Sequence, residues 1–144
     1  MSLTVDLRPC AGEAELSDPA FTGEFASEMA TIAAVPQVAP WCGYVAWQGS
    51  TPLGFGGFKG APAADGAVEI GYMTFPPHQG GGVAKSIAAA MTRIARANGA
   101  KSVLAHTLCE ENASTGVLHA TGFNRDGFGH DDDVGQVWRW QLGL

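Results

Sequence analysis

The sequence has 144 residues, an apolar fraction of 46%, a charged fraction of 15% and a formal net charge of −6. This length predicts a single domain over residues 1–144, large enough to bury its own core. The eight lysines and arginines are scattered, so no basic stripe for nucleic acid is present. No apolar run approaches the roughly 20 residues of a membrane helix, and no signal peptide is apparent, so we expect a cytoplasmic protein without membrane association.

The three cysteines, Cys10, Cys42 and Cys109, form no paired spacing. An odd number of isolated cysteines indicates neither a disulfide framework nor a metal site. We therefore expect free thiols and no bound metal.

The first half of the chain predicts strands around one helix. Leu3–Arg8 alternates apolar and polar residues, which is typical of a strand, and Asp18–Val35 carries apolar residues at helical spacing. Trp41–Trp47 and Pro52–Lys59 then predict two strands joined by a hairpin turn at Gln48–Thr51. The second of these strands is rich in glycine, which indicates a bulge or the close approach of another segment.

The second half predicts a β-α-β unit followed by a helix and a hairpin. Ala67–Phe75 and Lys101–Leu108 read as strands, and apolar residues at helical spacing from Val83 to the Asn98-Gly99 pair connect them. The remaining elements are a helix over Asn112–Thr121 and strands over Phe123–Gly129 and Gly135–Leu142. The order β-α-β-β-β-α-β-α-β-β predicts an α/β (α+β mixed) fold, with a mixed sheet and helices on both faces.

Three consecutive glycines, Gly80–Gly82, separate the strand over Ala67–Phe75 from the following helix. The first N–H groups of a helix lack partners and carry partial positive charge, and glycines leave them accessible to an anion. A dinucleotide fingerprint would follow the first strand as G-x-G-x-x-G, and a P-loop would end in Gly-Lys-Ser/Thr. Neither pattern fits, so the anion belongs to another ligand.

The stretch Gln79–Ala84 (QGGGVA) matches Q/R-x-x-G-x-G/A, and His106–Phe123 (HTLCEENASTGVLHATGF) lies downstream. In these motifs the chain resembles the GNAT superfamily of N-acetyltransferases, and in particular its ribosomal-protein N-terminal acetyltransferase subgroup, over about residues 65–142. The resemblance implies a mostly antiparallel sheet of about six to seven strands, splayed at a cofactor slot. It also implies acetyl-CoA as co-substrate and no metal.

The resemblance assigns cofactor-binding roles to individual residues. The N–H groups of the glycine turn, with the Gln79 side chain, would cradle the pyrophosphate, while the end of the preceding strand would pair with the pantetheine arm. The second helix would line the other side. The implied set is Met73, Phe75, Gln79, Gly80, Gly81, Gly82, Val83, Ala84, Asn112 and Ser114.

Acetyl transfer to an amine needs a base, because an alkylammonium with a pKa of about 10 must lose a proton before it attacks. Glu69 is the candidate base, in a near-apolar strand that could raise its pKa; the alternative is a solvent-facing carboxylate. Ser114 is the candidate acid or thiol-orienting group, and its alternative role is a helix cap. Leu118 stands where many relatives carry a tyrosine that protonates the thiolate. His106 is expected in the core, and its alternative role is catalytic.

The activity that the resemblance implies is acetyl transfer by direct attack of a primary amine, either a peptide N-terminus or a small amine. Two alternatives stay open: an O-acyl or longer-acyl transferase, and a non-catalytic CoA-binding or interaction module on the same fold. A homodimer through the aromatic C-terminal hairpin is a further possibility.

Overall fold

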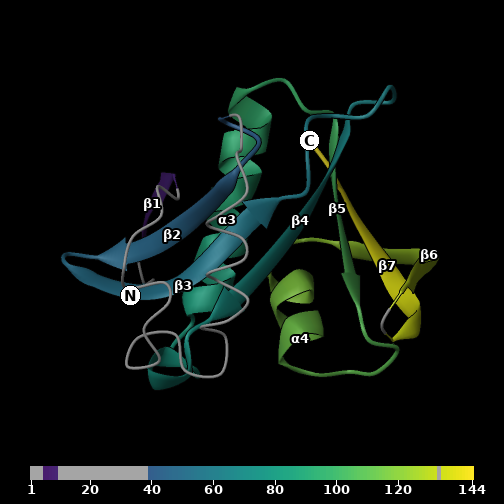
Figure 1. Cartoon of the computed structure of the whole chain (residues 1–144). Coiled ribbons are helices and arrows are strands. Elements are labelled where there is room, and N and C mark those ends of the chain that lie inside the picture. The colour runs from purple at the N-terminus through teal and green to yellow at the C-terminus, as the bar shows by residue number, and fades with distance from the viewer. Residues whose placement is uncertain (1–4, 10–38, 133) are drawn as a thin grey trace.

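A computed structural model describes residues 5–9, 39–132 and 134–144. In this part of the chain, seven strands form one sheet in the order β1-β2-β3-β4-β5-β7-β6 (Figure 1). The elements are β1 (Asp6–Pro9), β2 (Gly43–Gln48), β3 (Thr51–Phe58), β4 (Ala67–Thr74), the 3₁₀ turn η3 (Pro76–His78), α3 (Val83–Ala97), β5 (Ser102–Thr107), α4 (Ala113–Ala120), β6 (Asn124–Asp131) and β7 (Gly135–Gly143).

The expected mixed, mostly antiparallel sheet is confirmed. Every neighbouring pair is antiparallel except β4 and β5, which are parallel and are connected through α3. The predicted β-α-β unit is therefore present. The helix expected over Asp18–Val35, which would cover the second face of the sheet, lies outside the described residues.

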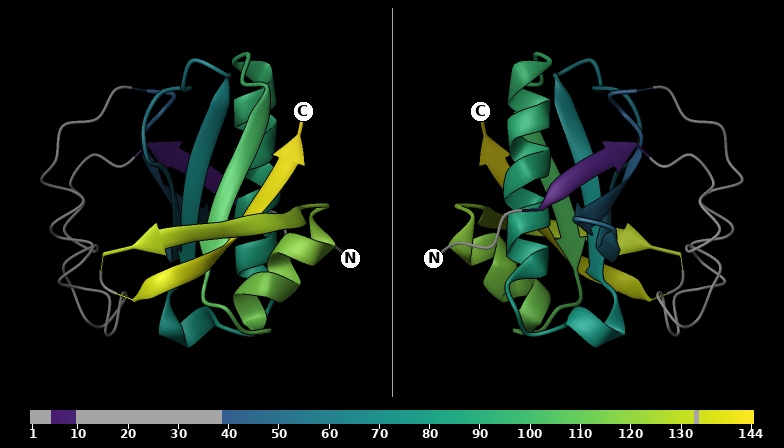
Figure 2. Two further views of the ribbon diagram at one scale, coloured as in Figure 1. Left: turned by 90° about the vertical axis from the view of Figure 1, so that its right-hand side faces the viewer. Right: turned by 90° about the vertical axis from the view of Figure 1, so that its left-hand side faces the viewer.

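Helix α3 packs closely on β3 and β4, along one face of the sheet, and also contacts α4 (Figure 2). Ile87 and Met91 of α3 are fully buried, and their side chains occupy the space that a side chain at Gly56 would need. A Cβ at Gly56 would lie 2.5 Å from Ile87 and 2.6 Å from Met91. The glycines of β3 thus permit the close approach that the sequence indicated.

Strands β4 and β5 separate after a short paired segment. Their register joins Ala67–Glu69 to Ser102–Leu104, after which no pairing between the two strands is recorded. Figure 1 shows the two strands diverging toward their C-terminal ends, with α4 beside the opening. The splay that was expected at the cofactor slot is therefore present, and it leaves the C-terminal half of β4 with one free edge.

Candidate functional site

The glycine turn places bare backbone at the start of α3. Gly80 and Gly82 have φ angles of +85° and +84°, a region that L-residues with side chains rarely adopt. Gly82 is the N-cap of α3, and no side chain caps this helix end. The Gln79 amide donates a hydrogen bond to the Thr74 carbonyl (3.3 Å), which ties the turn to the end of β4. The helix N-terminus is therefore open to an anionic group.

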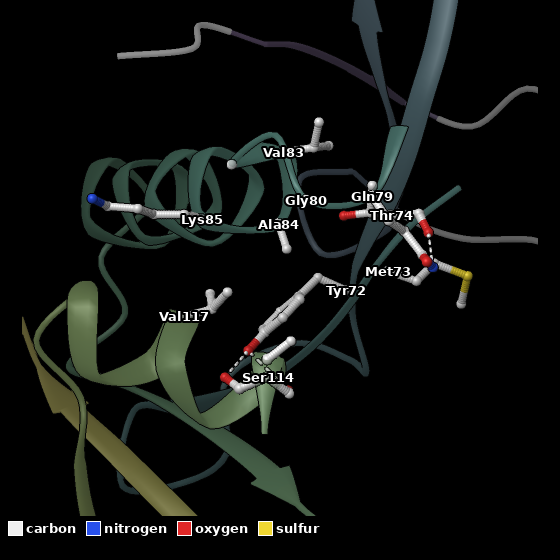
Figure 3. Close-up of a pocket in the computed structure, with 12 residues that line it drawn as sticks. Tyr72, Met73, Thr74, Gln79, Gly80, Val83, Ala84, Lys85, Ser114 and Val117 are labelled. Atoms are coloured by element: carbon white, nitrogen blue, oxygen red, sulfur yellow. Dashed lines mark hydrogen bonds between the residues drawn. The ribbon is translucent and has the colours of Figure 1, made fainter. Parts of the chain in front are cut away.

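A pocket of about 520 Å³ extends from this turn into the opening beside β4 (Figure 3). It is formed by the end of β4, the glycine turn, the first turn of α3 and the first half of α4. Its lining residues are Tyr72, Met73, Thr74, Gln79, Gly80, Gly82, Val83, Ala84, Lys85, Ala113, Ser114 and Val117.

Most of the predicted cofactor-binding residues lie together in this pocket. Seven of its lining residues are among those predicted from the sequence: Met73, Gln79, Gly80, Gly82, Val83, Ala84 and Ser114. Five lining residues were not predicted: Tyr72, Thr74, Lys85, Ala113 and Val117. The sequence did carry a signal for Tyr72. This residue alternates with Val68 and Ile70, which places it on the face of β4 that packs against α3.

Three predicted residues do not line the pocket. Phe75 is fully buried, and its N–H already donates to the Leu53 carbonyl (2.9 Å). Gly81 is in the turn, but only its two neighbours border the pocket. Asn112 caps α4: its side chain accepts from the Thr115 N–H (3.1 Å), in a reciprocal capping box with the Thr115 hydroxyl.

Tyr72 and Ser114 meet across the pocket. The Tyr72 hydroxyl donates to the Ser114 carbonyl (3.1 Å) and lies 3.2 Å from the Ser114 hydroxyl. Figure 3 shows the Tyr72 ring reaching from β4 toward α4, whereas Met73 points away on the other side of the strand. Leu118, at the position where many relatives carry a tyrosine, is fully buried and contributes to the core.

Glu69 of β4 lies in a three-residue cluster with Lys59, which directly follows β3, and His106 of β5. Its Oε2 is 2.8 Å from Lys59 Nζ and 3.0 Å from His106 Nδ1. Burial alone would raise the pKa of Glu69, but hydrogen bonds and charges from Lys59 and His106 outweigh it and lower the pKa below its usual value. The expectation of a raised pKa is therefore wrong, because the apolar sequence around Glu69 did not reveal these two partners.

His106 is half-exposed rather than enclosed in the core. Its side chain is 27% exposed, and its Nδ1 faces the Glu69 carboxylate. Since a carboxylate can only accept, this hydrogen bond places a proton on Nδ1 and leaves Nε2 as the basic nitrogen of the neutral ring. Glu69 thus fixes both the orientation and the tautomer of His106.

A second pocket, of about 340 Å³, includes Lys59 of this cluster. It is lined by Gly43, Phe55, Gly57, Phe58, Lys59, Gly71, Tyr72 and Met73. Phe55, Gly71 and Met73 alternate with the residues that face α3, so this pocket opens on the opposite face of the sheet. Tyr72 and Met73 border both pockets. Both pockets therefore border β4 at these two residues, beyond the segment that pairs with β5.

Within the described ranges 5–9, 39–132 and 134–144, no group of three or more His, Cys, Asp and Glu side chains is placed to hold a metal ion. No helix in the same ranges is long and apolar enough to cross a membrane.

A family model described as the acetyltransferase (GNAT) domain matches residues 13–124. The chain belongs to the GNAT acetyltransferase family. The glycine turn and the splayed strands are therefore the corresponding parts of a GNAT fold, as the sequence motifs implied. No curated protein sequence matches the chain.

Solved structures show the same GNAT fold at low sequence identity. An acetyltransferase of the GNAT family from Bacillus anthracis has a TM-score of 0.79 at 13% identity, covering 99% of this chain and 96% of its own. A ribosomal-protein-alanine N-acetyltransferase from Brucella melitensis has a TM-score of 0.61 at 18% identity, covering 71% and 68%. A variant of the spermidine N-acetyltransferase from Vibrio cholerae has a TM-score of 0.63 at 15% identity, covering 70% and 64%.

Proposed function

We propose that this protein is an acetyl-CoA-dependent N-acetyltransferase that moves an acetyl group from the thioester to a primary amine by direct attack. The observation that carries the proposal is the open glycine turn at one end of the slot beside β4. Gly80 and Gly82 present backbone N–H groups at the N-terminus of α3, which suits the pyrophosphate of CoA. The slot, of about 520 Å³, leads from this turn along β4, where an extended arm would lie.

The chemistry of the slot fits such a substrate along its length. Gln79, Val83 and Ala84 surround the glycine turn, Met73 and Thr74 provide the free edge of β4, and Val117 adds an apolar wall. A pantetheine arm carries amide groups that would pair with a strand edge and methyl groups that would contact apolar side chains. Ser114 lies at the far end, where the thioester would reach the junction of the two pockets.

We assign the acceptor amine to the second pocket, since it meets the slot at Tyr72 and Met73 from the opposite face of the sheet. The primary amine of a peptide N-terminus or of a small molecule would approach through this pocket. The Brucella melitensis relative is named for a protein substrate and the Vibrio cholerae relative for a polyamine, which supports both classes of acceptor.

Proton removal from the amine is proposed for Glu69 together with His106. Glu69 was the candidate base from the sequence, but its contacts with Lys59 and His106 lower its pKa and weaken it as a base. In the proposed pair, the Glu69 carboxylate orients His106 and stabilises the imidazolium, while His106 Nε2 accepts the proton directly or through water.

The test combines binding with turnover. Acetyl-CoA binding is measured by calorimetry, and thiol release is then followed with a panel of peptides, amino acids, polyamines and alcohols. Acetylation of at least one amine, verified by mass spectrometry, is the expected result. Acetyl-CoA binding without turnover on any acceptor would favour a CoA-binding module, turnover only with alcohols would favour an O-acyltransferase, and no binding would overturn the proposal.

A further inference from the structure

The reaction proposed above must end with a thiolate leaving the acetyl group, and a nearby acid would speed that step. The position at which many relatives carry a tyrosine for this purpose is Leu118, which is fully buried and has no proton to donate. The described residues that line the slot include three hydroxyl groups, on Tyr72, Thr74 and Ser114. Thr74 lies toward the glycine turn, where its carbonyl accepts from Gln79, whereas Tyr72 also borders the second pocket and contacts Ser114.

The contacts between these two residues distinguish their roles. The Tyr72 hydroxyl has one proton, and the Ser114 carbonyl (3.1 Å) accepts it, because a carbonyl can only accept. The Ser114 hydroxyl, 3.2 Å from the phenol oxygen, is then free to donate to that oxygen. The two contacts hold the end of the phenol in place, and a hydrogen bond donated by the Ser114 hydroxyl would stabilise negative charge on its oxygen.

We propose that Tyr72, entering the slot from β4, is the proton donor to the departing CoA thiolate, and that Ser114 positions the Tyr72 phenol. This inference rests on the proposed function and adds the acid that the buried Leu118 does not supply. In the step, the amine nitrogen forms a bond to the acetyl carbon and gives up a proton to the Glu69–His106 pair, while the C–S bond breaks with its electron pair leaving on sulfur. The Tyr72 proton passes to sulfur to give CoA thiol, and the phenolate regains a proton from solvent.

The Tyr72 phenol keeps its proton near neutral pH. Burial raises the pKa of the Tyr72 phenol above its ordinary value of 10.0, although the hydrogen bond with Ser114 acts in the opposite direction. The phenol is therefore protonated near pH 7 and can donate rather than accept. Lys85 of α3 is the one charged side chain among the described lining residues, and it is exposed.

The first test compares Tyr72→Phe, Ser114→Ala and Tyr44→Phe. Tyr44 is the other of the two tyrosines and donates to the Pro40 carbonyl (2.7 Å) away from the slot, so its variant is the matched control. We expect Tyr72→Phe to lower kcat by about 10²-fold with a KM for acetyl-CoA within about threefold of wild type. Ser114→Ala, which leaves the carbonyl contact intact, should cost less, and Tyr44→Phe should leave kcat unchanged.

A binding comparison tests the same role without turnover. If the Tyr72 hydroxyl contacts the sulfur, the wild type should bind CoA about tenfold more tightly than desulfo-CoA, and Tyr72→Phe should remove most of that preference. The comparison needs no acceptor, so it remains informative even if no amine is acetylated. An unchanged preference in Tyr72→Phe, or a kcat within about twofold of wild type, would overturn the proposal.

A second variant covers the case in which Tyr72→Phe does not fold. In the Tyr44→Phe background Tyr72 is the sole tyrosine, so incorporation of fluorotyrosine lowers the pKa of that phenol alone. The alkaline limb of the kcat profile should move to lower pH by the same amount as the phenol pKa. If the alkaline limb stays in place, or if Ser114→Ala lowers kcat more than Tyr72→Phe does, Tyr72 is not the donor.

Discussion

At the scale of single residues, the site depends on a few backbone angles and on contacts between side chains far apart in sequence. Gly80 and Gly82 lie at positive φ, whereas Gly81 between them does not. The three glycines of the turn are therefore not equivalent, although they look identical in the sequence. Positions 80 and 82 require glycine for its backbone conformation, whereas position 81 has no such requirement.

The glycine turn gives the first prediction. Gly82→Ala forces an L-residue to a φ near +84°, which costs roughly 1–2 kcal/mol and shifts the N–H groups at the start of α3. We expect at least about a tenfold loss of acetyl-CoA affinity by calorimetry. The control is Gly81→Ala, because a Cβ there meets only the His78 carbonyl, at 3.8 Å. Equal affinities of the two variants would show that the turn does not hold the cofactor as proposed.

The lowered pKa of Glu69 gives a prediction on stability. A carboxyl group whose pKa is lower in the folded state stabilises the fold above its unfolded pKa, near 4.5 here, and loses that contribution as pH falls through the folded value. The difference in free energy of unfolding between wild type and Glu69→Gln should therefore be largest above about pH 4.5 and shrink below it. Urea unfolding at several pH values measures this difference.

The partner Lys59 provides the control for that measurement. Lys59→Met keeps the length of the side chain and removes the ion pair at 2.8 Å, while the His106 contact remains. In the Lys59→Met background, the effect of Glu69→Gln on the free energy of unfolding should change less with pH. A difference that does not change with pH in either background would mean that the ionic cluster contributes nothing to stability.

At the scale of elements, α3 carries the site because glycines in β3 let the helix sit close to the sheet. Gly54 and Gly56 alternate on the face that α3 covers, and Ile87 fills the space above both. A close α3 brings its first turn beside the end of β4, where the slot begins. The position of the glycine turn is thus set by packing on β3, the strand next to β4.

This packing predicts opposite effects of one substitution at two strand positions. Gly56→Ala would place a Cβ 2.5 Å from Ile87 and should cost about 1–3 kcal/mol in free energy of unfolding. Gly71→Ala in β4 meets nothing within 4 Å, so it should be neutral or stabilise by up to about 1 kcal/mol, since alanine costs less entropy on folding. Thermal and urea unfolding compare them, and a Gly56→Ala variant as stable as wild type would contradict the packing argument.

The same elements show what the sequence could and could not predict. The strand, glycine turn and helix from Ala67 to Ala97 are local in sequence, and each carries its own signal in periodicity or glycine content, so these elements and the anion site were predicted. The pairing of Glu69 with His106 joins residues 37 positions apart, and that of Tyr72 with Ser114 joins residues 42 apart. Those contacts depend on where β4 and β5 stop pairing, and no local pattern encodes that point.

At the scale of the whole molecule, two pockets open on opposite faces of one sheet and share Tyr72 and Met73 in their linings. In the proposed reaction, acetyl-CoA would enter from one face and the amine from the other, so both would be bound at the same time. Direct transfer therefore needs no covalent intermediate on the protein. The alternative would require a nucleophile at the junction that could hold the acetyl group between the two substrates.

The described cysteines do not supply such a nucleophile. Cys42 is buried and Cys109 is exposed, with its Sγ 3.5 Å from the Gln136 carbonyl, and neither lines either pocket. We therefore predict sequential kinetics: double-reciprocal plots against acetyl-CoA at several amine concentrations should intersect, and CoA should compete with acetyl-CoA. Cys109→Ser should leave both patterns and kcat unchanged. Parallel plots, or an acetylated protein trapped in the absence of amine, would show instead that transfer passes through the enzyme itself.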